Sequence, residues 1–231
     1  MSKGPTQIDA QAYLDQVTAD TSDAVRKSAQ EKRHAKGFRT ARENLADLVD
    51  DDIFVEYGQL AVAAQRGRRD PESMRIDTAA DGVITGTATI NKDLIAGGKS
   101  DVAVAIYDYS VLAGTQGFFH HQKLDRIFEV AERERLPFVM YTEGGGGRPG
   151  DTDVKVNIAG LNSTSFSRWA GLTGKVPRVT VNNGYCFAGN AALFGAGDIR
   201  IATKSSSIGM AGPAMIEGGG LGSFHPNEIG P

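Results

Sequence analysis

Residues 137–150 read Pro-Phe-Val-Met-Tyr-Thr-Glu-Gly-Gly-Gly-Gly-Arg-Pro-Gly, an apolar run that ends in four consecutive glycines. The apolar run predicts a buried strand, and the glycines predict a turn at its carboxyl end. Glycine lets a backbone approach a ligand closely, so such a turn can present peptide N–H groups. Ligands of α/β folds bind beyond the carboxyl ends of strands. The turn is therefore a candidate site, with a flexible surface loop as the alternative.

A second transition from strand to glycine lies further along the chain. Arg178-Val-Thr-Val-Asn-Asn183 runs into Gly184-Tyr-Cys-Phe-Ala-Gly189, and a helix is expected over 187–195. The N–H groups of its first turn lack helical acceptors, and the helix dipole favours negative charge there. Gly189 is the expected donor, although a close strand-to-helix packing contact is the alternative. Two such turns facing each other would bind a developing oxyanion from both sides.

Nucleotide-binding loops do not fit the first turn. The Gly-Lys-Ser/Thr ending of a P-loop is absent, and Arg148-Pro149 interrupts any G-x-G-x-x-G that would open a helix. The glycines are therefore interpreted as a source of backbone donors.

The surrounding pattern predicts an α/β domain. Strands are expected over 53–57, 83–90, 102–107, 137–142, 176–182, 198–203 and 207–210. Helices are expected over 117–135, 158–171 and 187–195. Strand 83–90 alternates with Gly and Thr, which is typical of a half-exposed strand. The alternation of strands and helices indicates right-handed crossovers.

The N-terminal part is expected to be helical. Residues 8–35 predict a surface helix with a basic end, and Thr40–Val49 predicts a second helix with a capping box of Thr40 and Glu43. Residues 64–78 are polar and predict a loop. We divide the chain into a helical arm, residues 1–52, and a domain, residues 53–231.

Composition restricts the class of protein. The 231 residues are 40% hydrophobic and 23% charged, as is ordinary for a globular protein, and the net charge of −3 gives no reason to expect nucleic acid or a membrane surface as partner. No apolar stretch approaches the ~20 residues of a membrane helix. The single cysteine, Cys186, is expected to be a small buried thiol and fits a cytoplasmic location.

Several titratable residues are candidates for chemistry. Glu143 and Glu217 border glycine clusters and are candidate acids or bases, with loop anchors as the more ordinary alternative. His120 and His121 have no carboxylate or thiol at ligand spacing, so no metal is expected. A basic set would bind phosphates or form a solvated helical face: Lys32, Arg33, Lys36, Arg39 and Arg42.

Six segments, in order over about residues 30–231, resemble the biotin-dependent acyl-CoA carboxyltransferases. Two of them are residues 81–86, Asp-Gly-Val-Ile-Thr-Gly, and residues 205–213, Ser-Ser-Ser-Ile-Gly-Met-Ala-Gly-Pro. Residues 34–44, His-Ala-Lys-Gly-Phe-Arg-Thr-Ala-Arg-Glu-Asn, are similar to the family's GK-x-TARER opening. Residues 107–117, Tyr-Asp-Tyr-Ser-Val-Leu-Ala-Gly-Thr-Gln-Gly, are similar to its D-[FY]-[TS]-V-x-x-G-x-x-G segment. Residues 143–148 stand where many members have Ser-Gly-Gly-Ala-Arg, and residues 184–189 where they have Gly-x-Cys-x-Gly-Gly. Glu143 and Gly147 depart from the common residues, which indicates a divergent branch.

The resemblance implies a crotonase-like fold, a spiral of ββα units with an N-terminal helical arm. It also implies transfer of CO2 from carboxybiotin to the α-carbon of an acyl-CoA of the acetyl- or propionyl-CoA type, through an enolate held by peptide N–H groups. By motif position, the oxyanion hole is assigned to Gly145, Gly146 and Gly189. The implied substrate contacts are Gly144, Gly147, Arg148, Ala188, Lys36, Arg39 and Arg42. The implied partners are a biotin carrier protein, a biotin carboxylase and further subunits of an oligomer.

Two alternatives remain open. One is another crotonase-fold enzyme, a hydratase or a decarboxylase; hydratases have a catalytic Glu three residues after the oxyanion glycine, where this chain has Ala192. The other is a non-catalytic half that only assembles with a catalytic one. Residues 218–231 resemble an active-site loop, so we expect this chain to be a piece of a longer polypeptide. The residues do not fix which acyl-CoA is used.

Overall fold

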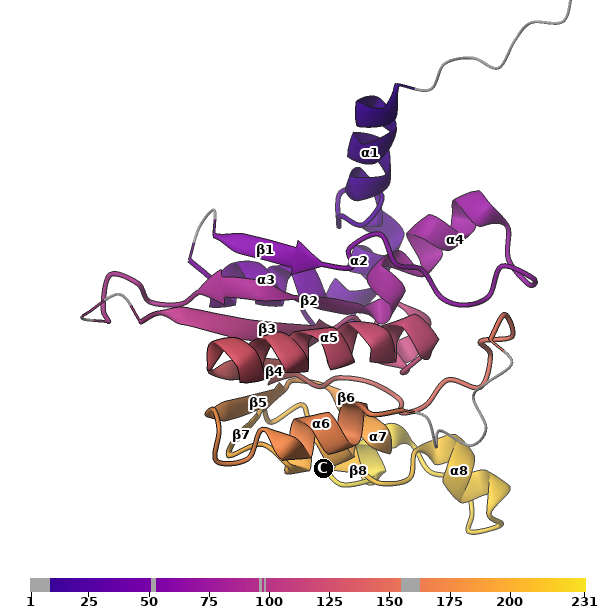
Figure 1. The fold of residues 1–231 in the computed structure, drawn as a ribbon. Helices are drawn as coiled ribbons and strands as arrows, with labels where there is room; N and C mark the ends of the chain where they lie inside the picture. Colours follow the sequence, from indigo (N-terminus) through magenta and orange to yellow (C-terminus); the bar gives the residue numbers. More distant parts are fainter. Residues whose placement is uncertain (1–8, 51–52, 96, 98, 155–162) are drawn as a thin grey trace, which may run out of the picture.

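The computed structural model describes residues 9–50, 53–95, 97, 99–154 and 163–231. Its centre is a six-stranded sheet of order β1-β2-β3-β4-β5-β7 (Figure 1). These strands are β1 Phe54–Tyr57, β2 Val83–Thr89, β3 Asp101–Tyr107, β4 Phe138–Tyr141, β5 Arg178–Asn182 and β7 Ile199–Ala202. β1, β2 and β3 pair antiparallel, and β3, β4, β5 and β7 pair parallel. A separate two-stranded sheet pairs β6 Tyr185–Phe187 with β8 Ser207–Gly209.

Helices cover both faces of the sheet around β2 and β3. Alternate residues of a strand face opposite sides, and Val83 packs with α5 Phe118–Glu134 whereas Ile84 packs with α3 Ala41–Leu48. The expectation that strand 83–90 is half-exposed is therefore wrong, because β2 is buried along most of its length. Gly and Thr serve close packing here: a Cβ on Gly86 would collide with the backbone of β1.

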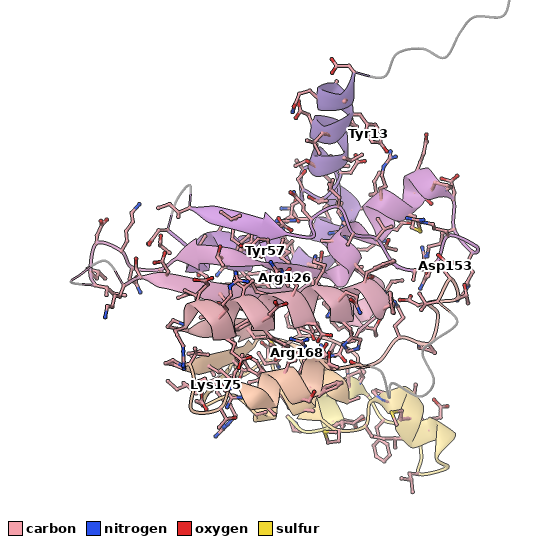
Figure 2. The ribbon with its side chains drawn as sticks, viewed as in Figure 1. Tyr13, Tyr57, Arg126, Asp153, Arg168 and Lys175 are labelled. Atoms are coloured by element: carbon pink, nitrogen blue, oxygen red, sulfur yellow. The ribbon has the colours of Figure 1, made fainter. Side chains whose placement is uncertain are left out.

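The expected amphipathic helix is confirmed as α5. Its face of Leu124, Ile127, Phe128 and Ala131 is fully buried against the sheet and α6 Ser165–Gly171. Phe128 and Trp169 of α6 pack with their rings tilted by 34° and their centroids 5.3 Å apart. The other side of α5 carries exposed charge, including Arg126 (Figure 2). The part of the expected helix over 158–171 that holds Ile158 and Leu161 lies outside the described residues.

The N-terminal helix expected over 8–35 is wrong in one respect. The chain forms two helices, α1 Ala10–Ala19 and α2 Lys27–His34. Between them the hydroxyls of Thr21 and Ser22 donate to the carbonyls of Thr18 and Ala19. Such side-chain hydrogen bonds compete with helix propagation, which is the physical reason for the break.

The helix with the capping box is confirmed as α3, in which Thr40 and Glu43 form both reciprocal hydrogen bonds. The loop expected over 64–78 is wrong in part, because it contains α4 Pro71–Asp77. Asp70 caps that helix and proline occupies its first turn, both ordinary start signals. α3 packs on the sheet through Ala41 and Leu45; the division into arm and domain stays a prediction.

In the C-terminal part of the chain, a helix follows each strand of the small sheet. α7 Gly189–Gly195 follows β6, and α8 Pro213–Gly218 follows β8. Three short 3-10 helices lie at Ala79–Gly82, Leu112–Gly114 and Pro226–Glu228. Within the described ranges, no helix is both long and apolar enough to cross a membrane.

Candidate functional site

The two glycine turns lie against each other at the carboxyl end of the sheet. The N–H of Gly144 donates to the carbonyl of Tyr185 at 2.7 Å, and the N–H of Phe187 donates to the carbonyl of Gly144 at 2.8 Å. A Cβ built on Gly146 would lie 2.6 Å from Ala188 Cβ and 3.6 Å from Gly189 N. The two turns are therefore in direct contact, as the sequence suggested.

Both turns have a backbone that ordinary side chains disfavour. Gly146 has φ +89°, in the left-handed region. Ala188, which immediately precedes α7, has φ +52° and ψ −121°, a strained conformation for a residue with a Cβ. Strain of this kind costs about 1–3 kcal/mol and is typical of functional sites.

The N–H groups of the first turn divide into two classes. That of Gly145 donates to Ala113 O at 3.0 Å, and that of Gly146 donates to Asn190 Oδ1 at 2.9 Å. Among the residues with described positions, the N–H groups of Gly147 and Gly189 donate no hydrogen bond. The geometry thus offers Gly147 and Gly189 as donors. The assignment of Gly145 and Gly146 to the oxyanion hole stays a prediction, and their N–H groups here shape the turn.

Asn190, which sequence reasoning missed, joins the two turns. Its side chain is fully buried, accepts from the N–H of Gly146 and donates through Nδ2 to Thr142 O at 3.1 Å. The sequence did carry a signal for Asn190, because a polar carboxamide stands beside small residues at the start of the predicted helix 187–195. Gly144 packs so closely on this amide that a Cβ there would collide with it.

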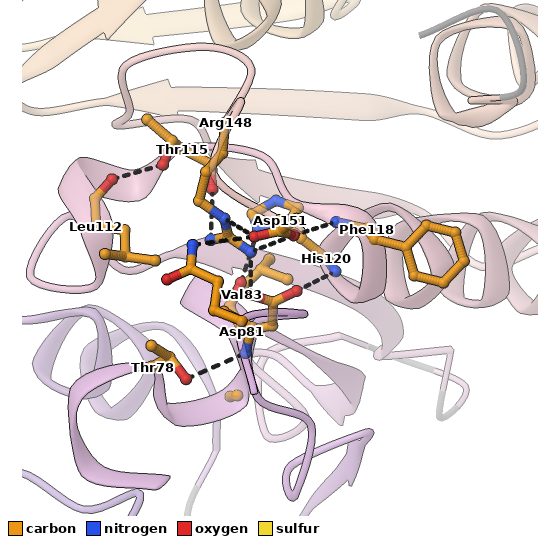
Figure 3. A network of polar contacts seen from close by, with 12 residues as sticks. Thr78, Asp81, Val83, Leu112, Thr115, Phe118, His120, Arg148 and Asp151 are labelled. Carbon is orange, nitrogen blue, oxygen red and sulfur yellow. Dashed lines mark hydrogen bonds and ion pairs between the residues drawn. The ribbon is translucent and has the colours of Figure 1, made fainter. Parts of the chain in front are cut away.

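Arg148 ties the first turn to the start of α5 (Figure 3). Its guanidinium pairs with Asp81 and donates to both carboxylate oxygens of Asp151, at 2.8 and 3.0 Å. Asp151 in turn accepts the N–H of Phe118 at 2.8 Å, and Asp81 accepts that of His120 at 2.7 Å. With its side chain only 5% exposed, Arg148 holds the position of Gly147. A direct contact of Arg148 with substrate stays a prediction.

The two carboxylates respond differently to this network. Burial raises the pKa of Asp81, against the opposing effect of Arg148. Burial acts in the same direction on Asp151, but the hydrogen bonds from Arg148 and the Phe118 N–H outweigh it and lower the pKa. Sequence reasoning missed both aspartates. Asp81 lies far from Arg148 along the chain, and Asp151 lies in a loop without a recognisable motif.

Glu143 is an anchor rather than an exposed acid or base. Arg33 of α2 donates to both of its carboxylate oxygens, at 2.8 and 2.6 Å, and both side chains are at most 8% exposed. Burial raises the pKa of Glu143, and Arg33 opposes that shift. Glu217, by contrast, lies exposed on α8.

Cys186 and His120 are buried, whereas His121 is partly exposed. Cys186 is fully buried, its Sγ lies 3.6 Å from Thr142 Oγ1, and burial raises the pKa of the thiol to about 12, which confirms the expected buried thiol. His120 is fully buried in the first turn of α5, and burial lowers its pKa. Within the described part of the chain, no cluster of His, Cys, Asp and Glu has the geometry to hold a metal.

A cavity of about 420 Å³ opens beside the turns. Lys32 of α2 and Lys36, which follows that helix, line it together with Phe38, Tyr109 and Tyr185. Because the carbonyl of Tyr185 accepts the N–H of Gly144, the cavity adjoins the first turn.

The three cations that the resemblance implies as substrate contacts are not equivalent. Lys36 lines the cavity, whereas Arg39 pairs with Asp47 at 2.9 Å and Arg42 donates to both oxygens of Glu56 at 2.6 and 3.0 Å. The structure thus brings only Lys36 of these three to the cavity. Their roles toward substrate stay predictions.

A mostly parallel sheet with two opposed backbone turns at the carboxyl ends of its strands is the crotonase-like arrangement, and solved structures confirm this fold. The chain is 26% identical to the transcarboxylase 12S subunit with methylmalonyl-coenzyme A bound, with a TM-score of 0.74 over 99% of this chain and 42% of that one. It is 53% identical to a single-chain, multi-domain long-chain acyl-CoA carboxylase, with a TM-score of 0.90 over 98% of this chain and 22% of that one.

Residues 32–220 match the family described as the carboxyl transferase domain, and the chain belongs to this family. One relative is the propionyl-CoA carboxylase beta chain of Saccharopolyspora erythraea, 29% identical over 188 residues, which are 80% of this chain and 32% of that protein. The chain spans about a third of the length of such curated relatives.

Proposed function

We propose that this chain forms the acyl-CoA half of a biotin-dependent carboxyltransferase, which adds a carboxyl group to the α-carbon of the thioester. The observation that carries the proposal is the pair of opposed turns, in which the N–H groups of Gly147 and Gly189 have no acceptor among the described residues. Membership of the carboxyl transferase domain family supports it.

The turns stabilise charge that develops on the thioester oxygen. Loss of the α-proton places negative charge on that oxygen, and two preorganised N–H donors hold it at little reorganisation cost. Peptide N–H groups do not titrate near neutral pH, so the turns act by where they hold these donors and not by proton transfer. Asn190 and Arg148 keep the first turn in place through the buried hydrogen bonds described above.

Carboxybiotin on a carrier protein would supply the carboxyl group. A Cβ on Gly147 would meet no atom within 4 Å, so the first turn is open beside Gly147. No residue of this chain is assigned to hold the biotin ring. A carrier protein, a biotin carboxylase, an oligomeric assembly and a cytoplasmic location belong to the same proposal.

The cavity beside the turns suits the nucleotide end of coenzyme A. Lys32 and Lys36 offer positive charge to its phosphates, and Phe38 and Tyr109 offer aromatic faces to its adenine. The 53% identity to a long-chain acyl-CoA carboxylase favours an acyl chain longer than the acetyl or propionyl group that the sequence suggested.

Decarboxylation is the second candidate. The methylmalonyl-CoA decarboxylase alpha subunit of Veillonella parvula is 30% identical over 190 residues. Loss of a carboxyl group from an acyl-CoA forms the same enolate, so the same turns would serve it. Hydration is disfavoured, because Ala192 occupies the position of the hydratase glutamate and Glu143 is held by Arg33.

Gly189→Val tests the site. A Cβ at residue 189 would lie 2.6 Å from Gln116 Oε1 and 3.0 Å from the Phe166 ring, so the valine forces these side chains or the second turn to shift. We expect carboxyl transfer to fall by about 100-fold and acyl-CoA binding to weaken. Gly195→Val, at the far end of α7 with no atom within 4 Å of its Cβ, is the matched control and should stay within about twofold.

The assay follows carboxybiotin-dependent product with acyl-CoA of several chain lengths in the assembled enzyme. If Gly189→Val transfers carboxyl groups as fast as the parent protein, Gly189 is not a donor. If the parent protein binds no thioester even with the rest of the assembly supplied, the non-catalytic alternative replaces the proposal.

A further inference from the structure

Gln116 lies between the two glycine turns, and its backbone contacts the first of them. Its N–H donates to Gly146 O at 2.7 Å, and its carbonyl accepts the N–H of Arg148 at 2.9 Å. These two hydrogen bonds flank Gly147 on both sides as a parallel bridge. The backbone of Gln116 thereby fixes the peptide that carries one of the two free donors.

The side chain of Gln116 contacts the second turn. It is 3% exposed, and its Oε1 lies 2.6 Å from the position that a Cβ of residue 189 would occupy. The carboxamide therefore fills the space next to the α-carbon of Gly189. Phe166 of α6 bounds the same position at 3.0 Å, so the peptide of Gly189 is enclosed by an amide and an aromatic ring.

Tyr107 holds the carboxamide of Gln116. Gln116 Nε2 donates to the Tyr107 hydroxyl at 2.9 Å, and both groups are buried. The phenol ring lies at the end of β3, with its centroid 4.5 Å from that of His120 in α5. Burial raises the pKa of Tyr107 and keeps the phenol neutral, so the contact is a neutral hydrogen bond between a rigid strand and the side chain under Gly189.

We propose that Gln116 is a positioning residue that fixes the N–H groups of Gly147 and Gly189 relative to each other, through its backbone for the first and its Tyr107-held carboxamide for the second. This rests on the proposed function, in which both N–H groups face the same oxyanion. A carboxamide suits the role because it is neutral: a carboxylate here would bring negative charge next to the developing enolate.

Steady-state kinetics of the assembled enzyme test the inference with Gln116→Met, Tyr107→Phe and the double variant. Gln116→Met keeps an unbranched side chain of similar length and removes the amide. We expect kcat to fall by about tenfold while KM for acyl-CoA changes by less than about twofold, because misplaced donors affect the transition state more than the bound substrate. Tyr107→Phe should show the same pattern, and Gln116→Glu a larger loss.

The double variant distinguishes a shared role from two separate ones. If the hydrogen bond between Tyr107 and Gln116 positions the site, removing both partners costs about as much as removing one. Thr85→Val is the matched control: it removes a buried hydrogen bond to Tyr57 O elsewhere in the sheet and should leave kcat unchanged. Losses that multiply in the double variant, or a raised KM at constant kcat, would overturn the inference.

Hydrogen exchange measured by mass spectrometry gives a readout that does not depend on activity. In Gln116→Met, peptides covering residues 144–148 and 185–192 should exchange faster, since both turns lose support, whereas Thr85→Val should not change them. If the parent protein transfers no carboxyl group but the exchange result holds, the proposed function fails and the positioning by Gln116 remains. If Gln116→Met is fully active with unchanged exchange, the positioning role is wrong and the proposed function stands.

Discussion

At the scale of single residues, the site is built from buried polar groups that each have an assigned partner. Asn190 and Gln116 bring neutral amides to the turns, and Arg148 brings a paired cation. Lys123 of α5 is a further case: it is 6% exposed and donates from Nζ to the carbonyls of Ala80 and Val83. Because burial disfavours the charged form of Lys123, we expect the free energy of unfolding to depend on pH.

Burial lowers the pKa of Lys123 from 10.5 to about 7. Above pH 7 the folded chain therefore binds fewer protons at this site than the unfolded chain does. Stability must then rise as the pH increases from about 7 towards 10.5, where the unfolded lysine also loses its proton. Urea unfolding at several pH values should show this rise in the parent protein and a weaker rise in Lys123→Met. Lys175→Met, at an exposed lysine, should keep the parent slope; equal slopes for both variants would contradict the prediction.

At the scale of elements, α2 holds the turn after β4 from outside the sheet. Arg33 reaches Glu143 and also donates to the carbonyl of Arg39, and its guanidinium lies 4.9 Å from the centroid of the Phe38 ring. Sequence reasoning placed Arg33 in a basic helical face. Only the packing of α2 against the turn shows that this cation is buried and paired.

Arg33→Met should destabilise the chain by about 3–5 kcal/mol, because it leaves the buried carboxylate of Glu143 unpaired. Arg39→Met is the matched control in the same segment. It removes an exposed pair with Asp47, which is worth about 0–1 kcal/mol. The free energy of unfolding in urea measures both, and comparable losses for the two variants would show that the Arg33 pair is not energetically special.

At the scale of the whole molecule, the cavity is formed by parts that are distant in the chain. Lys36 follows α2, Tyr109 follows β3 and Tyr185 lies in β6, and all three line it. Under the proposed function, the lysines that line the cavity would bind the phosphates of coenzyme A, and the adjoining glycine turns would bind the oxygen of its thioester. The position of the cavity therefore yields a prediction about binding without chemistry.

Lys36→Gln should raise KM for acyl-CoA by about fivefold to tenfold at unchanged kcat, because a phosphate contact affects bound substrate and transition state alike. An acyl-pantetheine thioester, which lacks the nucleotide, should show no such change. Arg126→Gln, at an exposed cation on α5, serves as the control. An equal effect of Lys36→Gln on both thioesters would contradict the placement of the phosphates in this cavity.

How much of the fold and of the site the sequence could predict depends on how far apart in the chain the interacting residues lie. The strands of the six-stranded sheet, α5, the capping box of α3 and the glycine turns are encoded by periodicity and by residues a few positions apart, so the sequence by itself predicted them. Strand β6, Tyr185–Phe187, was missed because it is formed within the second turn by pairing with the distant β8. The motif segments, taken in order, also predicted the family and its fold. The break between α1 and α2 and the presence of α4 were missed, although hydroxyl side chains at Thr21 and Ser22 and the pair Asp70-Pro71 carried local signals.

The roles of individual groups in the site were decided by tertiary structure. The N–H of Gly146 donates to Asn190 and that of Gly145 to Ala113, whereas those of Gly147 and Gly189 donate to none of the described residues. Sequence alone cannot assign this, because four neighbouring glycines are chemically identical and differ only in which distant acceptor each one meets. The sequence by itself thus predicted that backbone N–H groups would face a ligand, and long-range packing decided which of these groups donate within the described part of the chain.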